Sequence, residues 1–215
     1  MIIVTGAKGQ LGGFLVPWCR WSEDGEEMKK RRDYLNSLQK VAVEESRLGI
    51  PAIFGRDVIH GHHTAFPVGT ALAASFNPDM VEESYAAIGR EAANCGLKWC
   101  FAPMIDLSHD PRWGRCVESE GEDPYLTGEM GAAYVRNLQK HNVAATAKHF
   151  VAYGIPEGGI NLSPSHVGER EIREVMLEPF QRCIDEGVMS VMPSYAEIDG
   201  EPVHGSTKWL RDILR

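Results

Sequence analysis

The sequence predicts an α/β fold in which about five parallel strands carry helices on their outer side. Short apolar runs alternate along the chain with longer amphipathic segments, an order that is typical of parallel sheets. The segments after the second, third and fourth apolar runs are long and rich in Gly, Pro, His, Asp and Arg. An open doubly wound sheet and part of a (β/α)8 barrel both fit. In a barrel these long loops would meet at the C-terminal rim, where barrel enzymes carry their active sites.

The apolar runs are too short for globular helices, and each fits a strand that is buried on both faces. A helical pattern follows each of the later runs, as expected for a chain that crosses back over a parallel sheet. We expect strands at Leu11–Val16, Ile50–Gly55, Leu97–Ile105, Val143–His149 and Val188–Ser194.

Capping residues delimit several of the helices. Asn77 can cap a helix whose first position is taken by Pro78, and Gly187 can end a later helix. The polar stretch from residue 22 to residue 33 is expected to form a surface loop that enters the first helix. The expected helices are Tyr34–Leu48, Asp79–Cys95, Thr127–Gln139, Glu169–Glu186 and Thr207–Leu214.

Composition narrows the classes of partner. The chain has 22 basic and 30 acidic residues and a net charge of −8, which disfavours binding to nucleic acid. No apolar run approaches the ~18 residues that cross a bilayer, so we expect no membrane partner. Most of one acidic run is expected to be solvated surface or helix N-terminal charge; the run consists of Glu118, Glu120, Glu122 and Asp123.

The cysteines and the N-terminus point to a cytoplasmic protein. The five cysteines are odd in number and contain no C-x-x-C pair, so we expect reduced thiols, no disulfide framework and no structural zinc site. The first residues lack the basic segment of a signal peptide, which predicts a cytoplasmic location. Periplasmic or secreted locations stay open if Met1 is not the natural start.

The Gly6–Gly12 segment reads G-x-x-G-x-x-G after an apolar start, like a dinucleotide-binding loop. Such a loop requires a helix that opens at the glycines, whereas Gly13 and Pro17 interrupt it here. No apolar run precedes Asp24, the acidic residue at the right distance. An NAD-dependent reductase is therefore the weaker alternative, and we predict no cofactor.

Polar residues follow four of the predicted strands. Asp57 follows the second and Arg115 the third, Lys148 and His149 end the fourth, and Tyr195 follows the fifth. The carboxyl ends of parallel strands meet at one edge of a sheet, so these side chains are expected to converge. A carboxylate that accepts from neighbouring hydroxyls, beside cations that donate to others, suits a polyhydroxylated substrate.

Structural roles also fit some of these residues. Asp57 can serve as a turn or cap residue, and Lys148 can form a structural ion pair with a nearby acid. Three histidines occur close together in the loop after the second strand, but no placed carboxylate accompanies them. We therefore predict no metal site at His60, His62 and His63.

Several longer stretches occur in a characteristic order over about residues 35–215. They are Ser46–Pro51, Asp57–Gly61, Phe66-Pro67, Ala73–Phe76, Phe101–Pro103, Asp110–Arg115, Glu118 with Gly121–Tyr125, Lys148–Phe150, and Met192–Tyr195 with Asp199-Gly200. In this order they resemble glycoside hydrolase family 3, the group of β-glucosidases and β-xylosidases. The expected organisation is a lead-in with the first strand region at 1–34, followed by a partial N-terminal barrel domain of this family at 35–215.

The resemblance implies an incomplete (β/α)8 TIM-type barrel and retaining hydrolysis of terminal β-linked glucosyl or xylosyl residues. It implies a β-glucoside or β-xyloside oligosaccharide as substrate. It also implies a subsite for the non-reducing sugar, lined by Asp57, Arg115, Lys148, His149, Met192 and Tyr195.

Two features depart from the family pattern. Residues 158–161 read Gly-Gly-Ile-Asn where many relatives carry an arginine–aspartate pair, and the family's nucleophile and general acid would lie beyond Arg215. A retaining glycosidase needs two carboxylates about 5–5.5 Å apart. We therefore expect a fragment that is inactive alone and lacks the C-terminal part of the barrel and the second domain. A non-catalytic sugar-binding module is the alternative.

Overall fold

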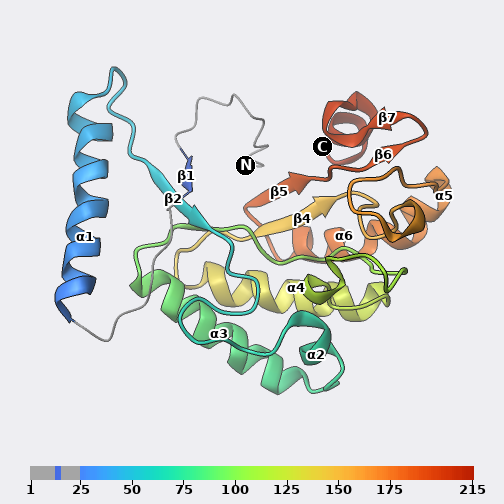
Figure 1. The fold of residues 1–215 in the computed structure, drawn as a ribbon, viewed down its shortest axis with the longest axis horizontal. Helices are drawn as coiled ribbons and strands as arrows, with labels where there is room; N and C mark the ends of the chain where they lie inside the picture. The colour runs from blue at the N-terminus through green and yellow to red at the C-terminus, as the bar shows by residue number, and fades with distance from the viewer. Residues whose placement is uncertain (1–12, 16–24) are drawn as a thin grey trace.

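The computed structural model describes residues 13–15 and 25–215. Its strands cross the centre of the molecule, and three helices, α3, α4 and α6, lie along one face of them (Figure 1). These helices are Pro78–Asn94, Pro124–Gln139 and Glu178–Asp185, and α4 packs between the other two. The Gly6–Gly12 segment, and with it the dinucleotide-binding alternative, lies outside the described residues.

Five strands follow one another in parallel. They are β1 (Gly13–Leu15), β2 (Ile53–Arg56), β3 (Trp99–Cys100), β4 (Thr146–Phe150) and β5 (Ser190–Pro193). β2 pairs with β1 and β3, and β4 pairs with β5. Single parallel bridges, Trp99 to Ala144 and Met104 to Lys148, join the third strand region to the fourth.

The strands thus lie in chain order from β1 to β5. A doubly wound sheet reverses its strand order at a switch point, whereas a (β/α)8 barrel places every strand beside its predecessor. The order therefore decides between the two architectures that the sequence left open, in favour of an incomplete TIM-type barrel. All five strands overlap the predicted positions. Past Cys100, the third strand region keeps single hydrogen bonds, such as that from Ile105 N to Lys148 O (2.8 Å).

The helix start predicted at Asn77 has a physical cap, and so does α4, which begins at Pro124, three residues before the predicted Thr127. Asn77 accepts a hydrogen bond from Met80 N (3.1 Å) at the start of α3, and Asp123 accepts one from Leu126 N (2.7 Å) at the start of α4. Gly187 follows α6 with φ +85°, the conformation that ends helices. The predicted surface loop at 22–33 is wrong for its second part, because α1 begins at Gly25. Glu, Lys and Arg fill this stretch, and all three favour helix.

Smaller elements complete the fold. A tight antiparallel hairpin turns at Asp199-Gly200, where both residues have positive φ, as a two-residue type I′ turn requires. The elements not yet named are α1 (Gly25–Lys40), α2 (Gly69–Ala73), α5 (Glu169–Glu171), β6 (Glu197–Ile198), β7 (Glu201–Pro202), π-helical turns at Val41–Glu45, Ile172–Met176 and Lys208–Ile213, and 3₁₀ turns at Cys116–Glu118, Glu157–Gly159 and Val203–Gly205.

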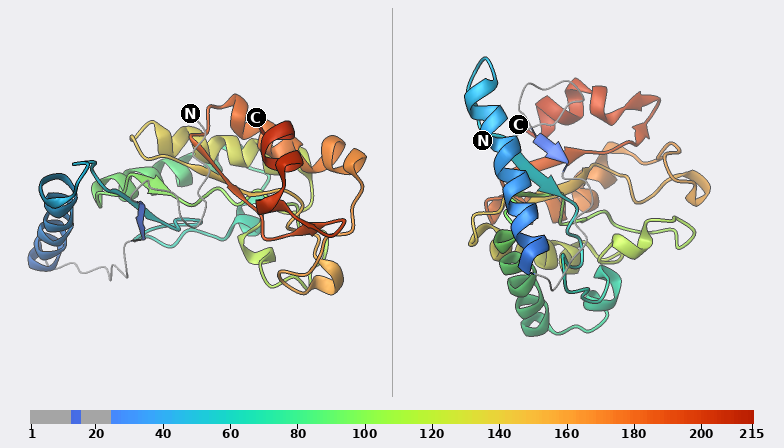
Figure 2. Two further views of the ribbon diagram at one scale, coloured as in Figure 1. Left: turned by 90° about the horizontal axis from the view of Figure 1, so that it is seen from above. Right: turned by 60° about the vertical axis from the view of Figure 1, so that its left-hand side comes forward.

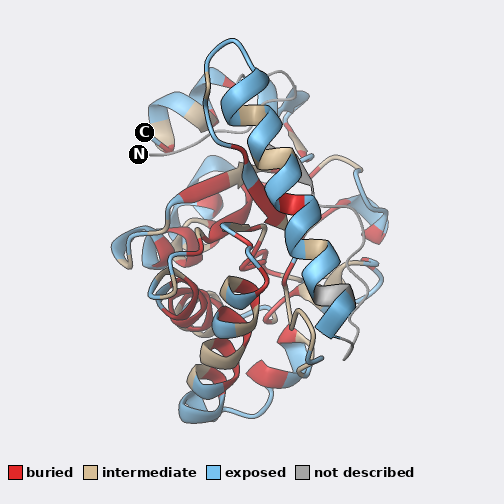
Figure 3. Ribbon diagram, turned by 90° about the vertical axis from the view of Figure 1, so that its left-hand side faces the viewer, coloured by how far each residue is buried: buried red, intermediate tan, exposed pale blue. Residues whose placement is uncertain are grey.

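The hydrophobic core has two parts that share α4. One contains Phe54, Tyr85 and Leu138 among its buried side chains, and the other contains Phe150 and Phe180. Figure 2 shows that α1 stands at one end of the molecule, and Figure 3 shows that most of α1 is exposed while the central strands are buried. The packed core therefore fixes the positions of the strands' carboxyl ends and of the residues that follow them.

Gly131 marks a close contact between α4 and α6 in this core. A Cβ atom at this position would lie 2.8 Å from Cys183 Sγ on α6 and 2.8 Å from Ile105 Cγ2. Gly131→Val is expected to lower the free energy of unfolding by about 2–3 kcal/mol through overpacking. Urea denaturation measures this loss. Gly205→Val is the matched control, because no atom of the described residues lies within 4 Å of its added Cβ, and an equal loss in both variants would contradict the packing argument.

Candidate functional site

An ion pair joins the ends of β2 and β4. Lys148 Nζ lies 2.8 Å from Asp57 Oδ1; the lysine side chain is 3% exposed, whereas the aspartate side chain is 56% exposed. Burial makes an unpaired ammonium costly, so the carboxylate compensates the Lys148 charge. The exposed Asp57 carboxylate keeps acceptor capacity for a ligand, because an ionised carboxylate offers about four lone-pair sites.

A second carboxylate orients His149. Asp106 is buried, and its Oδ2 accepts hydrogen bonds from His149 Nδ1 (2.7 Å) and from the His149 backbone N (3.1 Å). The proton on Nδ1 leaves Nε2 as an acceptor, and Arg115 Nη1 lies 3.3 Å from it. His149 is therefore held as a ring of defined tautomer between a carboxylate and a guanidinium group.

Arg115 is itself held by two contacts. Its Nε and Nη2 donate to both carboxylate oxygens of Glu118 (2.6 and 2.8 Å), and its Cζ lies 5.5 Å from the centre of the Tyr153 ring. Burial lowers the pKa of Arg115, but the Glu118 carboxylate outweighs it and raises the pKa above its ordinary value. Burial likewise raises the pKa of Glu118, and the Arg115 pairing brings it below the ordinary value. Both groups are therefore charged at neutral pH.

The structure brings the six predicted site residues together. His149 links the Asp57–Lys148 pair to Arg115, and the exposed Tyr195 ring lies 6.4 Å from the His149 ring, centre to centre. Met192 is half-buried and sits opposite Lys148 in the β4–β5 register. Their roles in binding a sugar stay a prediction.

Asn161 stands where the family pattern has a charged pair, and it braces the aromatic side of the site. Its Oδ1 accepts hydrogen bonds from Trp113 Nε1 (2.9 Å) and from the Tyr153 hydroxyl (2.9 Å). The Tyr153 ring packs edge-on against the rings of Trp113, His149 and Tyr195. Asn161 thus fixes the ring against which Arg115 and His149 rest.

Sequence reasoning missed three residues of this site. Asp106, Glu118 and Tyr153 hold the predicted residues in place, yet none was a candidate. Asp106 carried a usable signal, because it ends the third apolar run as Lys148-His149 ends the fourth. Tyr153 carried none, because only the turn after β4 brings its ring onto His149.

The interpretation of the acidic run was half right. Asp123 caps α4 and Glu122 is exposed, as expected. Glu118 is wrong as surface charge, because it pairs with Arg115. Glu120 is wrong as well: it is buried, its Oε1 accepts from the Tyr85 hydroxyl (3.1 Å), and its Oε2 has no hydrogen-bond partner among the described residues. Burial raises the Glu120 pKa to about 8.

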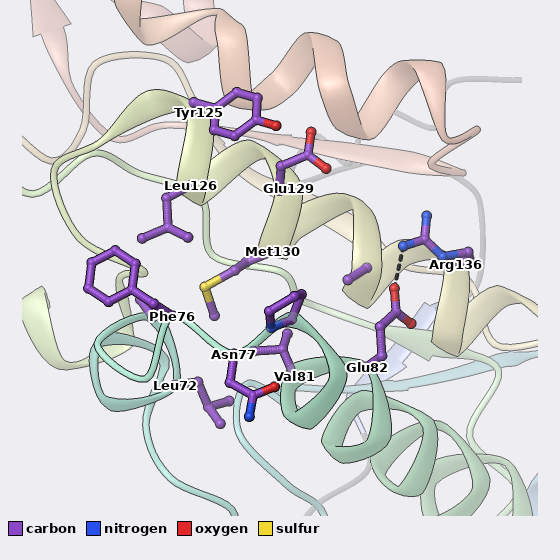
Figure 4. Close-up of a pocket in the computed structure, with 13 residues that line it drawn as sticks. Leu72, Phe76, Asn77, Val81, Glu82, Tyr125, Leu126, Glu129, Met130 and Arg136 are labelled. Carbon is purple, nitrogen blue, oxygen red and sulfur yellow. Dashed lines mark hydrogen bonds and ion pairs between the residues drawn. The ribbon is translucent and has the colours of Figure 1, made fainter.

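A separate groove lies on the helical face, between α3 and α4 (Figure 4). Its volume is about 430 Å³, and Phe76, Leu126 and Met130 contribute an apolar lining. An ion pair between Glu82 and Arg136 closes one side. None of the six predicted site residues lines this groove, whose lining is mostly apolar. The charged and hydrogen-bonding groups that could bind a polar substrate lie in the cluster at the strand ends.

Metal-ligating side chains gather outside the strand-end cluster. Among the described residues, His62, His63 and Cys95 form such a group. Cys100, Cys116 and Cys183 are free cysteines in the structure, and Cys19 lies outside the described residues. In the described part of the chain, no helix has the length and apolar character that a membrane crossing demands.

The parallel strand order and the cluster at the strand ends define an α/β barrel-type domain with a polar site at its rim. The sequence model described as the glycosyl hydrolase family 3 N terminal domain matches residues 7–215. The chain belongs to glycoside hydrolase family 3. It is 37% identical over 190 residues to a periplasmic beta-glucosidase of Salmonella typhimurium, covering 86% of this chain and 25% of that protein. It is 38% identical over 193 residues to a beta-xylosidase of Formosa agariphila, covering 81% and 27%.

Solved structures agree with this assignment. A beta-glucosidase from Listeria innocua in complex with glucose superimposes with a TM-score of 0.81 at 37% identity, covering 84% of this chain and 26% of that one. An exo-1,3/1,4-beta-glucanase from a Pseudoalteromonas species superimposes with a TM-score of 0.86 at 30% identity, covering 94% and 28%. The chain spans about a quarter of the length of these relatives.

Proposed function

We propose that this chain supplies the sugar-binding subsite of a retaining β-glucosidase or β-xylosidase. The main observation in support is that four side chains converge at neighbouring strand ends: Asp57, Arg115, Lys148 and His149. Each of them is held by a charged or hydrogen-bonding partner. Relatives named beta-glucosidase and beta-xylosidase, and a similar structure solved with glucose, support this class of substrate.

The geometry suits a terminal pyranose ring. The Asp57 carboxylate accepts from two adjacent hydroxyls, while Lys148 and Arg115 donate to ligand oxygens. The exposed Tyr195 ring offers an apolar face for the ring hydrogens. An inverted hydroxyl would leave one of these charged groups without its hydrogen-bond partner on the sugar, so the subsite discriminates between epimers.

The bond-breaking groups belong to a further part of the enzyme in this proposal. The carboxylates of the site are already engaged, since Asp57 pairs with Lys148, Asp106 with His149 and Glu118 with Arg115. Retaining hydrolysis needs a nucleophile and an acid/base about 5–5.5 Å apart. We place both beyond Arg215.

The boundary predicted at residue 34, between the lead-in and the barrel domain, also stays a prediction.

The test is to express a longer protein, encoded by the gene as it continues past the codon for Arg215. Its hydrolysis of aryl β-D-glucosides and β-D-xylosides is then measured. We expect hydrolysis with retention by the longer chain and none by residues 1–215. Hydrolysis by the 215-residue chain would overturn the assignment of the reactive carboxylates. A longer chain that binds glucose or xylose without cleaving glycosides would favour the sugar-binding module, and stabilisation by NAD would favour the reductase.

A further inference from the structure

Two histidines and a cysteine from distant parts of the chain lie together. His62 and His63 belong to the loop after β2, and Cys95 caps the C-terminal end of α3. One ligating atom from each lies within 4.8 Å of the others. Bonds of about 2.0–2.3 Å place the nitrogen and sulfur ligands of tetrahedral zinc about 3.5 Å from one another. Small side-chain rotations therefore bring all three atoms onto one ion.

His62 supplies an independent sign of a missing partner. Both of its ring nitrogens are buried and have no hydrogen-bond partner in the described part of the chain. A buried polar group in this state costs about 1–3 kcal/mol, and a metal bond would remove the deficit for one nitrogen.

The loop is already held in position against the helix. Glu91, one helical turn before Cys95, accepts hydrogen bonds from the backbone N atoms of His63 (3.2 Å) and Thr64 (3.0 Å). A bridge between Gly61 and Ala65 closes the loop around both histidines. Side chains that are already positioned by contacts of this kind lose less conformational entropy when they bind an ion. The His63 Nε2 atom accordingly lies 2.6 Å from Cys95 Sγ.

Charges of both signs lie around the cluster, and a cavity gives access to it. Arg31 and Arg56 bring positive charge to this region. The Glu91 carboxylate and a Cys95 thiolate supply two negative charges, which match the charge of a divalent ion but leave the two arginines uncompensated. Cys95 and Arg31 also line a cavity of about 660 Å³ beside α1, through which an ion can reach the sulfur.

We propose that His62, His63 and Cys95 form a binding site for a zinc-like divalent ion, with water as the fourth ligand. Two imidazoles and a thiolate are nitrogen and sulfur ligands typical of zinc, whereas magnesium and calcium prefer oxygen. The ion ties the loop that begins at Asp57 to the end of α3. It is a site separate from the strand-end cluster and does not depend on the proposed hydrolase function.

Cobalt(II) is the probe for this site. The purified, metal-free 215-residue chain is titrated with Co²⁺, and the absorption spectrum is recorded before and after addition of Zn²⁺. We expect one four-coordinate cobalt per chain, a thiolate-to-cobalt charge-transfer band, and displacement by Zn²⁺. Cys95→Ser removes that band, and His62→Ala weakens Co²⁺ binding at least about a hundredfold, since losing even a second-shell partner costs about 10–100-fold. Cys183→Ala and His166→Ala are matched controls outside the cluster and leave the spectrum unchanged.

Three results would overturn the proposal. The first is a wild-type cobalt spectrum without the thiolate band, a result that does not depend on whether the variants fold. The second is a Cys95 alkylation rate, followed by peptide mass spectrometry, that Zn²⁺ does not slow. The third is thermal stabilisation by phosphate and not by Zn²⁺, which would assign the cluster, with Arg31 and Arg56, to an anion.

Discussion

Asp57→Ala is expected to lower kcat/KM toward an aryl β-glucoside about a thousandfold in the chain extended past Arg215. The carboxylate would lose hydrogen bonds to two sugar hydroxyls, each worth about 1.5–3 kcal/mol when one partner is charged, and about 1.4 kcal/mol corresponds to a factor of ten. Subsite bonds of this kind strengthen in the transition state, so the loss appears in kcat as well as in KM. Steady-state kinetics of the purified variant measure both.

The same substitution removes the partner of a buried cation. Lys148 is 3% exposed, and Asp57 is its paired carboxylate, so thermal denaturation of the variant should show a lower melting temperature as well. Activity is therefore compared per folded molecule. Glu174→Ala is the control, because it also removes a carboxylate from an ion pair, with Arg170, but one on the surface. Near-normal kcat/KM in Asp57→Ala would reject the role assigned to this carboxylate.

Glu120→Gln is expected to stabilise the protein at alkaline pH and to change little near pH 5. Burial raises the Glu120 pKa in the folded state to about 8, against about 4.3 in an unfolded chain. The protonated carboxyl contributes its full stability below about pH 4.3, and that contribution is lost as the pH rises toward 8. At about pH 8.5, a shift of this size corresponds to roughly 3–5 kcal/mol.

Urea denaturation at about pH 5 and about pH 8.5 measures this effect. The difference in unfolding free energy between Glu120→Gln and the wild type should grow by about 3 kcal/mol across that interval. The amide keeps an acceptor for the Tyr85 hydroxyl, so packing is preserved. Glu122→Gln, at an exposed neighbouring position, should show no such growth. A constant difference at both pH values would mean that Glu120 ionises normally in the folded protein.

Local patterns predicted the strands and the helix caps well. A strand or a cap is set by residues within a short window, such as Asn77 with Pro78, whose capping bond spans three residues. The exception is α1, where a charged stretch was taken for a loop. The Glu, Lys and Arg residues of this stretch favour the α-helix, and the helix forms although few of its side chains are buried.

The sequence alone determined the alternation of strands and helices, the polar residues at the strand ends and the resemblance to the family. The tertiary structure decided which polar groups meet: Lys148 reaches Asp57 across 91 residues, and Cys95 reaches His63 across 32. It also decided that Glu120 is buried while Glu122 is not. Partners and burial depend on how distant segments pack, because desolvation and pairing are properties of the surroundings rather than of the residue type.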